Sequence, residues 1–207
     1  MNEEWLQRWS EGRIGWHEDE GNASLKKHWR ASGCRVLVPM CGKTPDLVWL
    51  AEQGNEVVGV ELSRMAVEAF FDEQDLEYAI EDDDVPIYRA GRLPITIYCG
   101  DLFELDGLGC DAHYDRGALV ATTAKRRPAY ARKVSALLET MPEQLIIALE
   151  YDESIAEGPP FSVPADELLN YWPDLVCLEA YDDIENGPPK FREAGLEEMT
   201  ELVWRSP

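Results

Sequence analysis

The stretch VLVPMCGKTPD, Val36 to Asp46, determines which fold and function the rest of the sequence supports. It begins as an unbroken apolar run, which is typical of a strand buried on both faces, and it ends in a turn that leads into a helical pattern. Three interpretations compete for it: a nucleotide-phosphate loop, a reactive thiol at Cys41, and the cofactor-binding turn of a doubly wound sheet. Each of them predicts a different protein.

The first two interpretations lack the residues that their chemistry requires. A phosphate loop of the form G-x-x-x-x-G-K-[ST] needs a glycine five positions before Gly42, where this chain has Leu37. Without that glycine no cradle of backbone N–H groups forms around a phosphate. Cys41 has no histidine near it in sequence to act as a base, and a small buried cysteine at a strand end is the commoner case.

The cofactor-turn interpretation predicts an acidic residue about 20 positions further on, at the end of the next strand, where it binds ribose hydroxyls. Glu61, within the apolar stretch EVVGVELS of residues 56–63, lies at that place. A buried carboxylate needs donors, and a ribose diol supplies two. The alternative is that Glu61 caps the helix that begins near Arg64. Because only Gly42 of the pattern G-x-G-x-x-G is present, spacing alone does not separate a dinucleotide from S-adenosylmethionine.

The remaining pattern predicts strands that alternate with helices. Strands are expected at residues 35–41, 56–63, 95–103, 113–120 and 144–152, and helices at 5–12, 22–30, 44–53, 64–73, 125–140 and 166–172. Residues 75–94 are irregular and indicate an insertion, and residues 175–183 and 199–205 alternate as an antiparallel edge pair does. Such alternation predicts a mainly parallel sheet covered on both faces, with its ligand at the carboxyl ends of the strands.

Composition limits the partners that the protein can have. The 207 residues favour one domain, and 41 Asp and Glu against 19 Lys and Arg give a net charge of -22, which argues against nucleic acid and anionic membranes. No apolar run reaches the ~18–20 residues of a membrane span, and the first residues do not resemble a signal peptide. The five cysteines form no C-x-x-C pair and the histidines are scattered, so no metal site is expected. These features predict a cytoplasmic protein.

Seven motifs, taken in order, carry a family resemblance. They are W-x-x-x-W followed by G-x-x-x-W-H at residues 5–17, then VLVPMCGK, VVGVELS, AVEAFF, YCGDLF, YDRGALVA and YDESIAEGPPFSVP. Together they resemble the thiopurine S-methyltransferase family, in particular its bacterial members, over nearly the whole chain. The resemblance implies a Rossmann-like class I methyltransferase fold with a seven-stranded, mostly parallel sheet whose last strand is antiparallel. It also implies a monomer formed by a single domain, residues 1–207, in which residues 1–30 form a helical lid over S-adenosyl-L-methionine.

The same resemblance assigns the site residues. The family's cofactor contacts fall on Trp5, Trp9, Met40, Glu61, Asp101, Leu102 and Arg116, and its substrate contacts on Trp16 and Phe161. Met40 replaces the family's usual leucine with a side chain of similar volume, so the contact should survive. In the carboxy-terminal segment IENGPPKFREAGL, where some relatives carry a second substrate-binding arginine, Arg192 is the candidate.

The chemistry of methyl transfer gives these residues roles. Aromatic faces attract the sulfonium cation, and a cation near the acceptor's sulfur favours the reactive thiolate. Arg116 is the catalytic candidate for that cation, although it could also bind the cofactor's carboxylate or form a salt bridge with an acidic residue of this chain. Asp115 is the candidate proton acceptor. The prediction is an enzyme that S-methylates small aromatic or heterocyclic thiols, with selenium or tellurium compounds as further acceptors; the alternatives are a non-catalytic S-adenosylmethionine-binding protein and a nicotinamide-dependent oxidoreductase.

Overall fold

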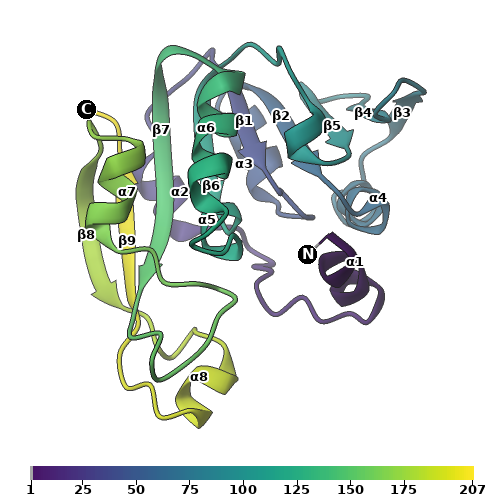
Figure 1. The fold of residues 1–207 in the computed structure, drawn as a ribbon. Helices are drawn as coiled ribbons and strands as arrows, with labels where there is room; N and C mark the ends of the chain where they lie inside the picture. The colour runs from purple at the N-terminus through teal and green to yellow at the C-terminus, as the bar shows by residue number, and fades with distance from the viewer. Residues whose placement is uncertain (1) are drawn as a thin grey trace.

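The computed structural model describes residues 2–207, and the side chains among them except those at positions 2, 140 and 141. One central sheet separates two layers of helices (Figure 1). Helices α5, α6 and α7 cover one face of the sheet, and α2, α3 and α4 cover the other. The apolar residues of the central strands are buried between these two layers, as expected for a parallel sheet with helices on both sides.

The strands of the described residues form one sheet, in the order β3-β4-β5-β2-β1-β6-β7-β9-β8. Their bounds are β1 Arg35–Pro39, β2 Glu56–Glu61, β3 Tyr78–Glu81, β4 Ile87–Ala90, β5 Ile95–Cys99, β6 Cys110–Arg116, β7 Leu138–Glu150, β8 Val176–Asp182 and β9 Thr200–Arg205. Strands β5, β2, β1, β6 and β7 are parallel, while β9 runs antiparallel to β7 and β8 antiparallel to β9. The predicted seven-stranded sheet with an antiparallel last strand is thus confirmed.

Two further strands extend this sheet beyond the prediction. Residues 75–94, expected to be irregular, contain the antiparallel hairpin of β3 and β4, which pairs with β5 at the edge of the sheet. The hairpin is held by an ion pair between Arg89 and Glu81 (2.7 Å) and by ring contacts of Tyr78 with Phe71 and Tyr88. Because β3 is exposed along its whole length, its sequence lacks the apolar run that marks the central strands.

The helices agree closely with the sequence pattern. Their bounds are α1 Asn2–Ser10, α2 Ala23–His28, α3 Asp46–Glu52, α4 Arg64–Glu73, α5 Ala118–Ala121, α6 Arg127–Leu137, α7 Ala165–Tyr171 and α8 Pro189–Glu193, with a short 3-10 helix, η1, at Leu102–Glu104. Asn22 caps α2 by accepting a hydrogen bond from the Leu25 N–H (3.0 Å). The helix expected over residues 125–140 ends earlier, because β7 begins directly at Leu138. The short helices α5, η1 and α8 were not predicted. The strands expected over residues 95–103 and 113–120 end earlier, at Cys99 and Arg116, and their last residues belong to η1 and α5.

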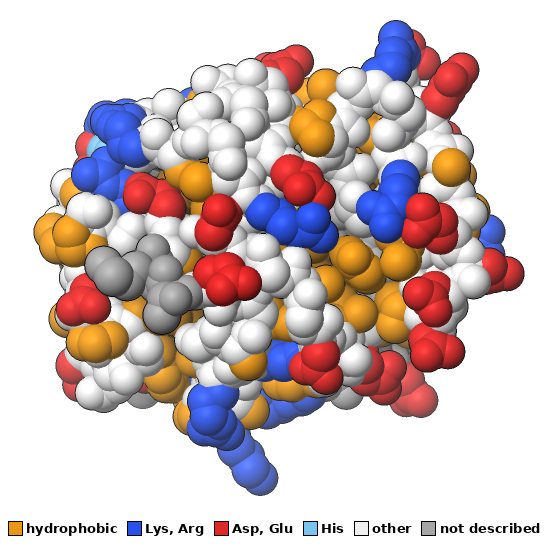
Figure 2. Space-filling model, turned by 90° about the horizontal axis from the view of Figure 1, so that it is seen from above, with side chains coloured by type: hydrophobic (Ala, Val, Ile, Leu, Met, Phe, Trp, Pro, Cys, Tyr) orange, Lys and Arg blue, Asp and Glu red, His pale blue; other side chains and the backbone are white. Residues whose placement is uncertain are grey.

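Strand β1 lies at the switch point of the sheet, since the strands on its two sides, β2 and β6, are reached by connections in opposite directions. Ligands of such sheets bind beyond the carboxyl ends of the strands at this point. On the molecular face seen in Figure 2, acidic and basic side chains are interspersed and no patch of a single sign stands out. None of the described helices is long and apolar enough to cross a membrane.

Candidate active site

A cavity of about 630 Å³ lies at the carboxyl ends of β1, β2, β5 and β6. It brings together eight of the predicted site residues: Trp5, Trp9, Trp16, Met40, Glu61, Asp101, Leu102 and Arg116. The predicted residues Asp115 and Phe161 are not part of its lining. We call the part lined by Met40, Gly42, Glu61, Asp101 and Leu102 the cofactor region, and the part lined by Val120, Leu149, Pro159, Pro160 and Met199 the acceptor region.

The turn after β1 has a backbone that few residues tolerate. Met40 and Gly42 both have positive φ angles, of +48° and +57°. At Gly42 a side chain would be strained, and its Cβ would also lie 3.3 Å from the Trp9 ring. Met40 is one of the few non-glycine residues in this left-handed region, and such strain concentrates at functional sites. The turn thus allows close approach of a ligand and of the N-terminal segment to the end of β1.

Glu61 joins this turn to the turn after β2. Its Oε2 accepts a hydrogen bond from the Gly42 N–H (2.9 Å), and its Oε1 accepts one from the Ser63 N–H (2.7 Å). The side chain is only 6% exposed, and burial raises the pKa of its carboxyl group. Ser63, not Glu61, caps α4, through its own hydroxyl and the Ala66 N–H (3.3 Å). The carboxylate oxygens keep further lone pairs, and Glu61 lines the cavity, so the ribose role stays a prediction.

Across the cofactor region, the end of β5 presents Asp101 and Leu102. Asp101 caps the short helix η1, because its Oδ1 accepts a hydrogen bond from the Phe103 N–H (3.0 Å). This bond fixes the direction of the carboxylate, and Leu102 packs into the core beside it at 3% exposure. An acid and an apolar side chain therefore stand side by side in the lining of the cavity, where cofactor contacts were predicted.

Three tryptophans cover the cavity from the N-terminal segment. The Trp16 ring meets the rings of Trp5 and Trp9 edge-to-face, at centroid distances of 5.3 and 6.0 Å and an interplanar angle of 81° in both pairs. Trp9 is buried against Gly42, and all three rings line the cavity. The same rings therefore pack against one another and line the cavity.

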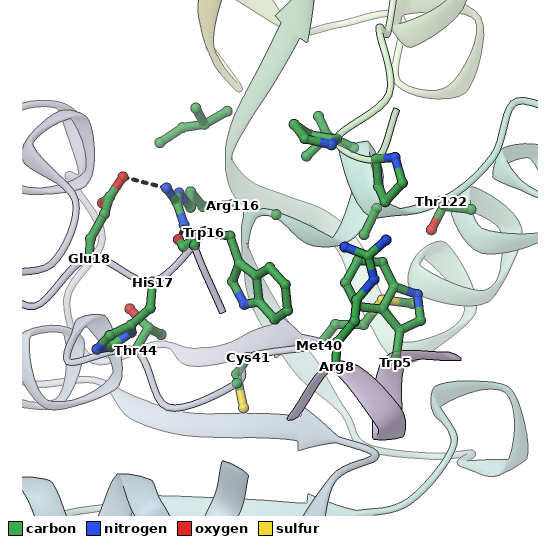
Figure 3. A pocket seen from close by; sticks show the side chains of 18 of the residues that line it. Trp5, Arg8, Trp16, His17, Glu18, Met40, Cys41, Thr44, Arg116 and Thr122 are labelled. Atoms are coloured by element: carbon green, nitrogen blue, oxygen red, sulfur yellow. Dashed lines mark hydrogen bonds and ion pairs between the residues drawn. The ribbon is translucent and has the colours of Figure 1, made fainter. Parts of the chain in front are cut away.

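Arg116, at the end of β6, is engaged by the N-terminal segment. Its Nη1 donates to the Trp16 carbonyl and its Nη2 pairs with the Glu18 carboxylate (Figure 3). The salt bridge that the sequence left open as an alternative thus exists, with Glu18 rather than Asp115 as the partner. Arg116 lines the cavity and at the same time ties residues 16–18 to the sheet.

The structure corrects the prediction for Asp115. Strand side chains alternate between the two faces of a sheet, so Tyr114 and Arg116 reach the cavity while Asp115 points away from it. Its oxygens accept hydrogen bonds from the Leu119 N–H (3.1 Å) and the Tyr130 hydroxyl (2.6 Å). The side chain is fully buried, and burial raises the pKa of its carboxyl group to about 6. Asp115 is therefore not in position to take a proton from an acceptor in the cavity.

The prediction for Phe161 also needs correction. Its loop does form a wall of the cavity, but through Pro159 and Pro160. The Phe161 ring instead folds back on Gly158, where an added Cβ would lie 2.4 Å from the ring, and its backbone N–H donates to the Val120 carbonyl (2.6 Å). Two neighbouring prolines leave the backbone few alternatives, and this fixes which side of the loop faces the cavity.

Eight charged residues that line the cavity were not predicted as site residues: Arg8, Arg13, Glu18, Lys43, Asp46, Asp183, Lys190 and Glu201. Arg8 lies three positions after Trp5, and that spacing puts both on one face of α1. Lys190 belongs to the carboxy-terminal segment in which Arg192 was the candidate. The structure places Arg192 outside the lining, in an ion pair with Glu185 (2.7 Å).

Cys41 lines the cavity but its thiol is buried, which raises the pKa of the thiol well above its usual value and keeps it protonated. Its sulfur packs against Gly59, where a Cβ would lie only 2.9 Å from Sγ. The structure thus favours the packing role for Cys41. Within residues 2–207, no group of three or more His, Cys, Asp or Glu side chains is arranged to hold a metal ion.

The protein-family model for thiopurine S-methyltransferase (TPMT) matches residues 1–206 of this chain. The chain belongs to the thiopurine S-methyltransferase family. Relatives of that name from Bordetella petrii and Pseudomonas syringae pv. syringae are 46% and 43% identical to it, over 97% of this chain and 95% and 94% of their own length. Membership confirms the predicted family, the enzyme class and the cofactor, S-adenosyl-L-methionine.

Solved structures confirm the fold of this family member. A SAM-dependent methyltransferase from Anabaena variabilis has a TM-score of 0.64 at 14% identity, covering 100% of this chain and 95% of its own. A 1,6-didemethyltoxoflavin-N1-methyltransferase from Burkholderia thailandensis, with S-adenosylhomocysteine bound, has a TM-score of 0.61 at 17% identity, covering 99% and 86%. At such identities the likeness shows the methyltransferase fold alone.

Proposed function

We propose that this protein methylates the sulfur of small aromatic and heterocyclic thiols. The observation that carries the proposal is the continuity of one cavity, which joins the cofactor region to the acceptor region and has Trp16 in its lining. A flat ring fits between such apolar surfaces without losing hydrogen bonds. Bound in this way, the ring would bring its sulfur to the cofactor in a fixed orientation, and orientation is the main contribution that a displacement reaction needs.

The cofactor region fits S-adenosylmethionine. Glu61 offers carboxylate lone pairs for the ribose hydroxyls, and Asp101 with Leu102 suits the adenine. The left-handed turn at Met40 and Gly42 brings the backbone close to the ligand. When bound, the cofactor supplies a methyl group on a sulfonium, which is already activated for attack. The protein then has to align the acceptor and exclude water.

The N-terminal segment is suited to both tasks, and we propose that it acts as the lid. It is fastened at two points: Glu18 pairs with Arg116, and the Asn22 N–H donates to Asp46 Oδ1 (2.8 Å). Asp46 is fixed in turn, because Tyr114 donates to its Oδ2 (2.9 Å). Between the lid and the sheet, the tryptophan rings displace water, and an aromatic face attracts a sulfonium by about 0.5–2 kcal/mol.

Arg116 has a second effect on the acceptor. A guanidinium beside the acceptor's sulfur lowers the pKa of the thiol and raises the thiolate fraction. Glu18 offsets part of that charge, so we assign Arg116 chiefly a positioning role through the lid. Aromatic thiols are acidic enough to ionise with little help, which agrees with the absence of Asp115 from the cavity lining.

Selenium and tellurium compounds are a second proposed acceptor class, supported by the resemblance to bacterial family members. Small selenium or tellurium nucleophiles need only the same access to the methyl group, and a cavity of about 630 Å³ leaves room for them beside a cofactor. The cytoplasmic location and the monomeric state stay predictions.

The test begins with calorimetric titration by S-adenosylhomocysteine, with NAD as the control. Micromolar binding of the first and none of the second is expected. Mass-spectrometric detection of methylated product follows, with thiophenol, 6-mercaptopurine and selenite as acceptors. Binding without any methylated product would favour the alternative of a non-catalytic S-adenosylmethionine-binding protein. No binding of S-adenosylhomocysteine would contradict the assignment of the cofactor region.

A further inference from the structure

Two cationic side chains, Arg8 of α1 and Lys190 of α8, line the cavity. Their helices come from opposite ends of the chain, yet both lie beyond the edge of the sheet at which β1 ends (Figure 1). The chain has more than twice as many acidic as basic residues, 41 against 19, so an excess of positive charge at one place is unexpected. An anion that binds there would explain the placement.

Neither side chain has its positive charge fully matched by the protein. Arg8 Nη2 pairs with Glu4 (3.1 Å), which is 56% exposed, and its guanidinium lies over the Trp5 ring at 5.1 Å. Arg8 Nε is buried and has no hydrogen-bond partner among the described residues. Lys190 Nζ donates to the Glu157 carbonyl (2.7 Å), a neutral acceptor. A buried donor without an acceptor is costly, so this end of the cavity favours a ligand that supplies one.

The two cations also act on each other. Partial burial lowers the pKa of Lys190 and the positive charge of Arg8 lowers it further, while the negative charge of the exposed Glu157 carboxylate opposes part of this shift. Like charges that share a cavity raise the free energy of the empty site, and an anion between them removes that repulsion. A planar carboxylate suits this place, because a guanidinium can donate two parallel hydrogen bonds to it.

The other cations that line the cavity, Arg13, Lys43 and Arg116, each form an ion pair with a carboxylate. The acidic side chains of the cavity then help to set the direction in which an acceptor binds. In Figure 3, Arg8 and Trp5 lie on one side of Trp16, and Arg116 with Glu18 lies on the other. Near Arg116 stands Glu201, a buried carboxylate that accepts a hydrogen bond from the Tyr181 hydroxyl. A carboxylate would be repelled by Glu18 and Glu201 and attracted by Arg8 and Lys190.

We propose that Arg8 and Lys190 form a carboxylate-binding subsite, and that the preferred acceptors are aromatic thiols bearing a ring carboxylate. The proposal rests on the proposed function, and it names the acceptor class for the same site. The ring lies against Trp16, the carboxylate reaches Arg8 and Lys190, and the thiol sulfur faces the cofactor region. One other carboxylate could occupy the subsite, namely that of the cofactor's methionine moiety.

The experiment separates these cases without requiring turnover. The protein is saturated with S-adenosylhomocysteine, and 4-mercaptobenzoate and its neutral analogue 4-mercaptobenzamide are each titrated by calorimetry. The wild-type protein should bind the carboxylate at least tenfold more tightly than the amide. Arg8→Gln and Lys190→Gln should each reduce this ratio by about fivefold or more, the scale of one charge-assisted hydrogen bond in a partly hydrated site.

Arg192→Gln is the matched control, because it removes a cation from the same helix that pairs with Glu185 outside the cavity. Its ratio should equal that of the wild type, and Lys190→Met serves as a second variant if Lys190→Gln is poorly folded. Equal affinities for the two ligands in the wild type would overturn the subsite. A second outcome would also overturn it. If Arg8→Gln loses affinity for S-adenosylhomocysteine but not for 5′-methylthioadenosine, which lacks the carboxylate, then the cofactor's carboxylate occupies the subsite.

Methyl transfer is assayed separately, so that a failure of the subsite can be told from a failure of the proposed function. A tenfold preference for the carboxylate without any product would support the subsite and contradict the proposed enzymatic function. Methylation of thiophenol with no preference for the carboxylate would support the function and refute the subsite.

Discussion

Glu61→Gln tests how one carboxylate supports both the fold and the cofactor. In the wild type, each oxygen accepts one backbone N–H, from Gly42 (2.9 Å) and from Ser63 (2.7 Å). Glutamine keeps one acceptor oxygen but turns its NH₂ group toward the other N–H, which leaves two donors facing each other. An unsatisfied buried donor costs about 1–3 kcal/mol. Glu61 is buried, which raises the pKa of its carboxyl group. A neutral amide at this position avoids the cost of desolvating a charge, and this gain offsets part of the loss.

We therefore expect the free energy of unfolding to fall by only about 1–2 kcal/mol, which urea denaturation can measure. The affinity for S-adenosylhomocysteine should fall by more, about tenfold, or about 1.4 kcal/mol, if the ribose hydroxyls donate to Glu61. Ser63→Ala is the matched control in the same turn. It removes the cap of α4, at a cost of about 1 kcal/mol in stability, and leaves the carboxylate unchanged.

A double-mutant cycle decides whether the lost affinity belongs to the ribose. Wild type and Glu61→Gln are each titrated with S-adenosylhomocysteine and with its 2′-deoxy and 3′-deoxy analogues. If Glu61 binds the hydroxyls, deleting the hydroxyl and changing the residue remove the same interaction, and the two losses do not add. Additive losses would refute the ribose contact and leave Glu61 as a link between two turns.

Three further predictions concern two buried residues of β6, His113 and Asp115, and the lid residue Glu18. Burial lowers the pKa of His113 from 6.5 to about 3, so the stability that neutral His113 provides is present above pH 6.5 and is lost as the pH falls toward 3. Burial raises the pKa of Asp115 from 3.8 to about 6, so protonated Asp115 stabilises the fold as the pH falls, but over a narrower pH range than His113. Urea unfolding should therefore show a net loss of unfolding free energy on acidification, and His113→Gln should abolish this loss. Asp115→Asn should lower the melting temperature while kcat/KM and its pH profile stay within about threefold of the wild type; a hundredfold loss of rate would restore the proton-acceptor hypothesis. Glu18→Gln should loosen the lid, which trypsin detects as faster cleavage after Arg13, slowed again by S-adenosylhomocysteine; unchanged cleavage would mean that the Arg116 pair does not hold the lid.

The sequence was sufficient to predict those helices and strands whose bounds follow from the local pattern of residues alone. Strand β2 and the capped helix α4 could be predicted almost to the residue, because an unbroken apolar run and a serine cap stand directly before an amphipathic pattern. The same stretch placed Glu61 at a strand end, and strand ends of a parallel sheet meet at one edge. The predicted residues at strand ends, Met40, Glu61, Asp101, Leu102 and Arg116, therefore share one cavity.

Ion pairs between residues far apart in the sequence could not be predicted from local pattern. Arg116 and Glu18 are 98 residues apart in sequence, and in a chain with 41 acidic residues nothing local singles out Glu18 as the partner. Lys190 was missed because the short helix α8 decides which of its two cations faces the cavity. The Asp115 prediction failed for another reason: two consecutive strand residues cannot both face one cavity, and this alternation could have excluded one of the pair in advance.

The strong acidity of the chain gives the carboxylate subsite a distinctive dependence on salt. At a net charge of -22, the long-range field repels an anionic acceptor before it reaches the cavity. Salt screens that field over about 10 Å at 0.1 M, while the short-range contact at the half-buried Arg8 is screened less than the field. The exposed Lys190 adds little to this difference. We therefore expect kcat/KM for 4-mercaptobenzoate to rise as sodium chloride is increased from about 20 to 200 mM, and kcat/KM for the neutral amide to stay nearly constant. Arg8→Gln should keep this upward slope at a lower absolute value, because it changes the contact inside the cavity and leaves the distant field nearly intact. A fall in kcat/KM with salt would show that a local cationic attraction dominates the approach, and the argument from net charge would then be wrong.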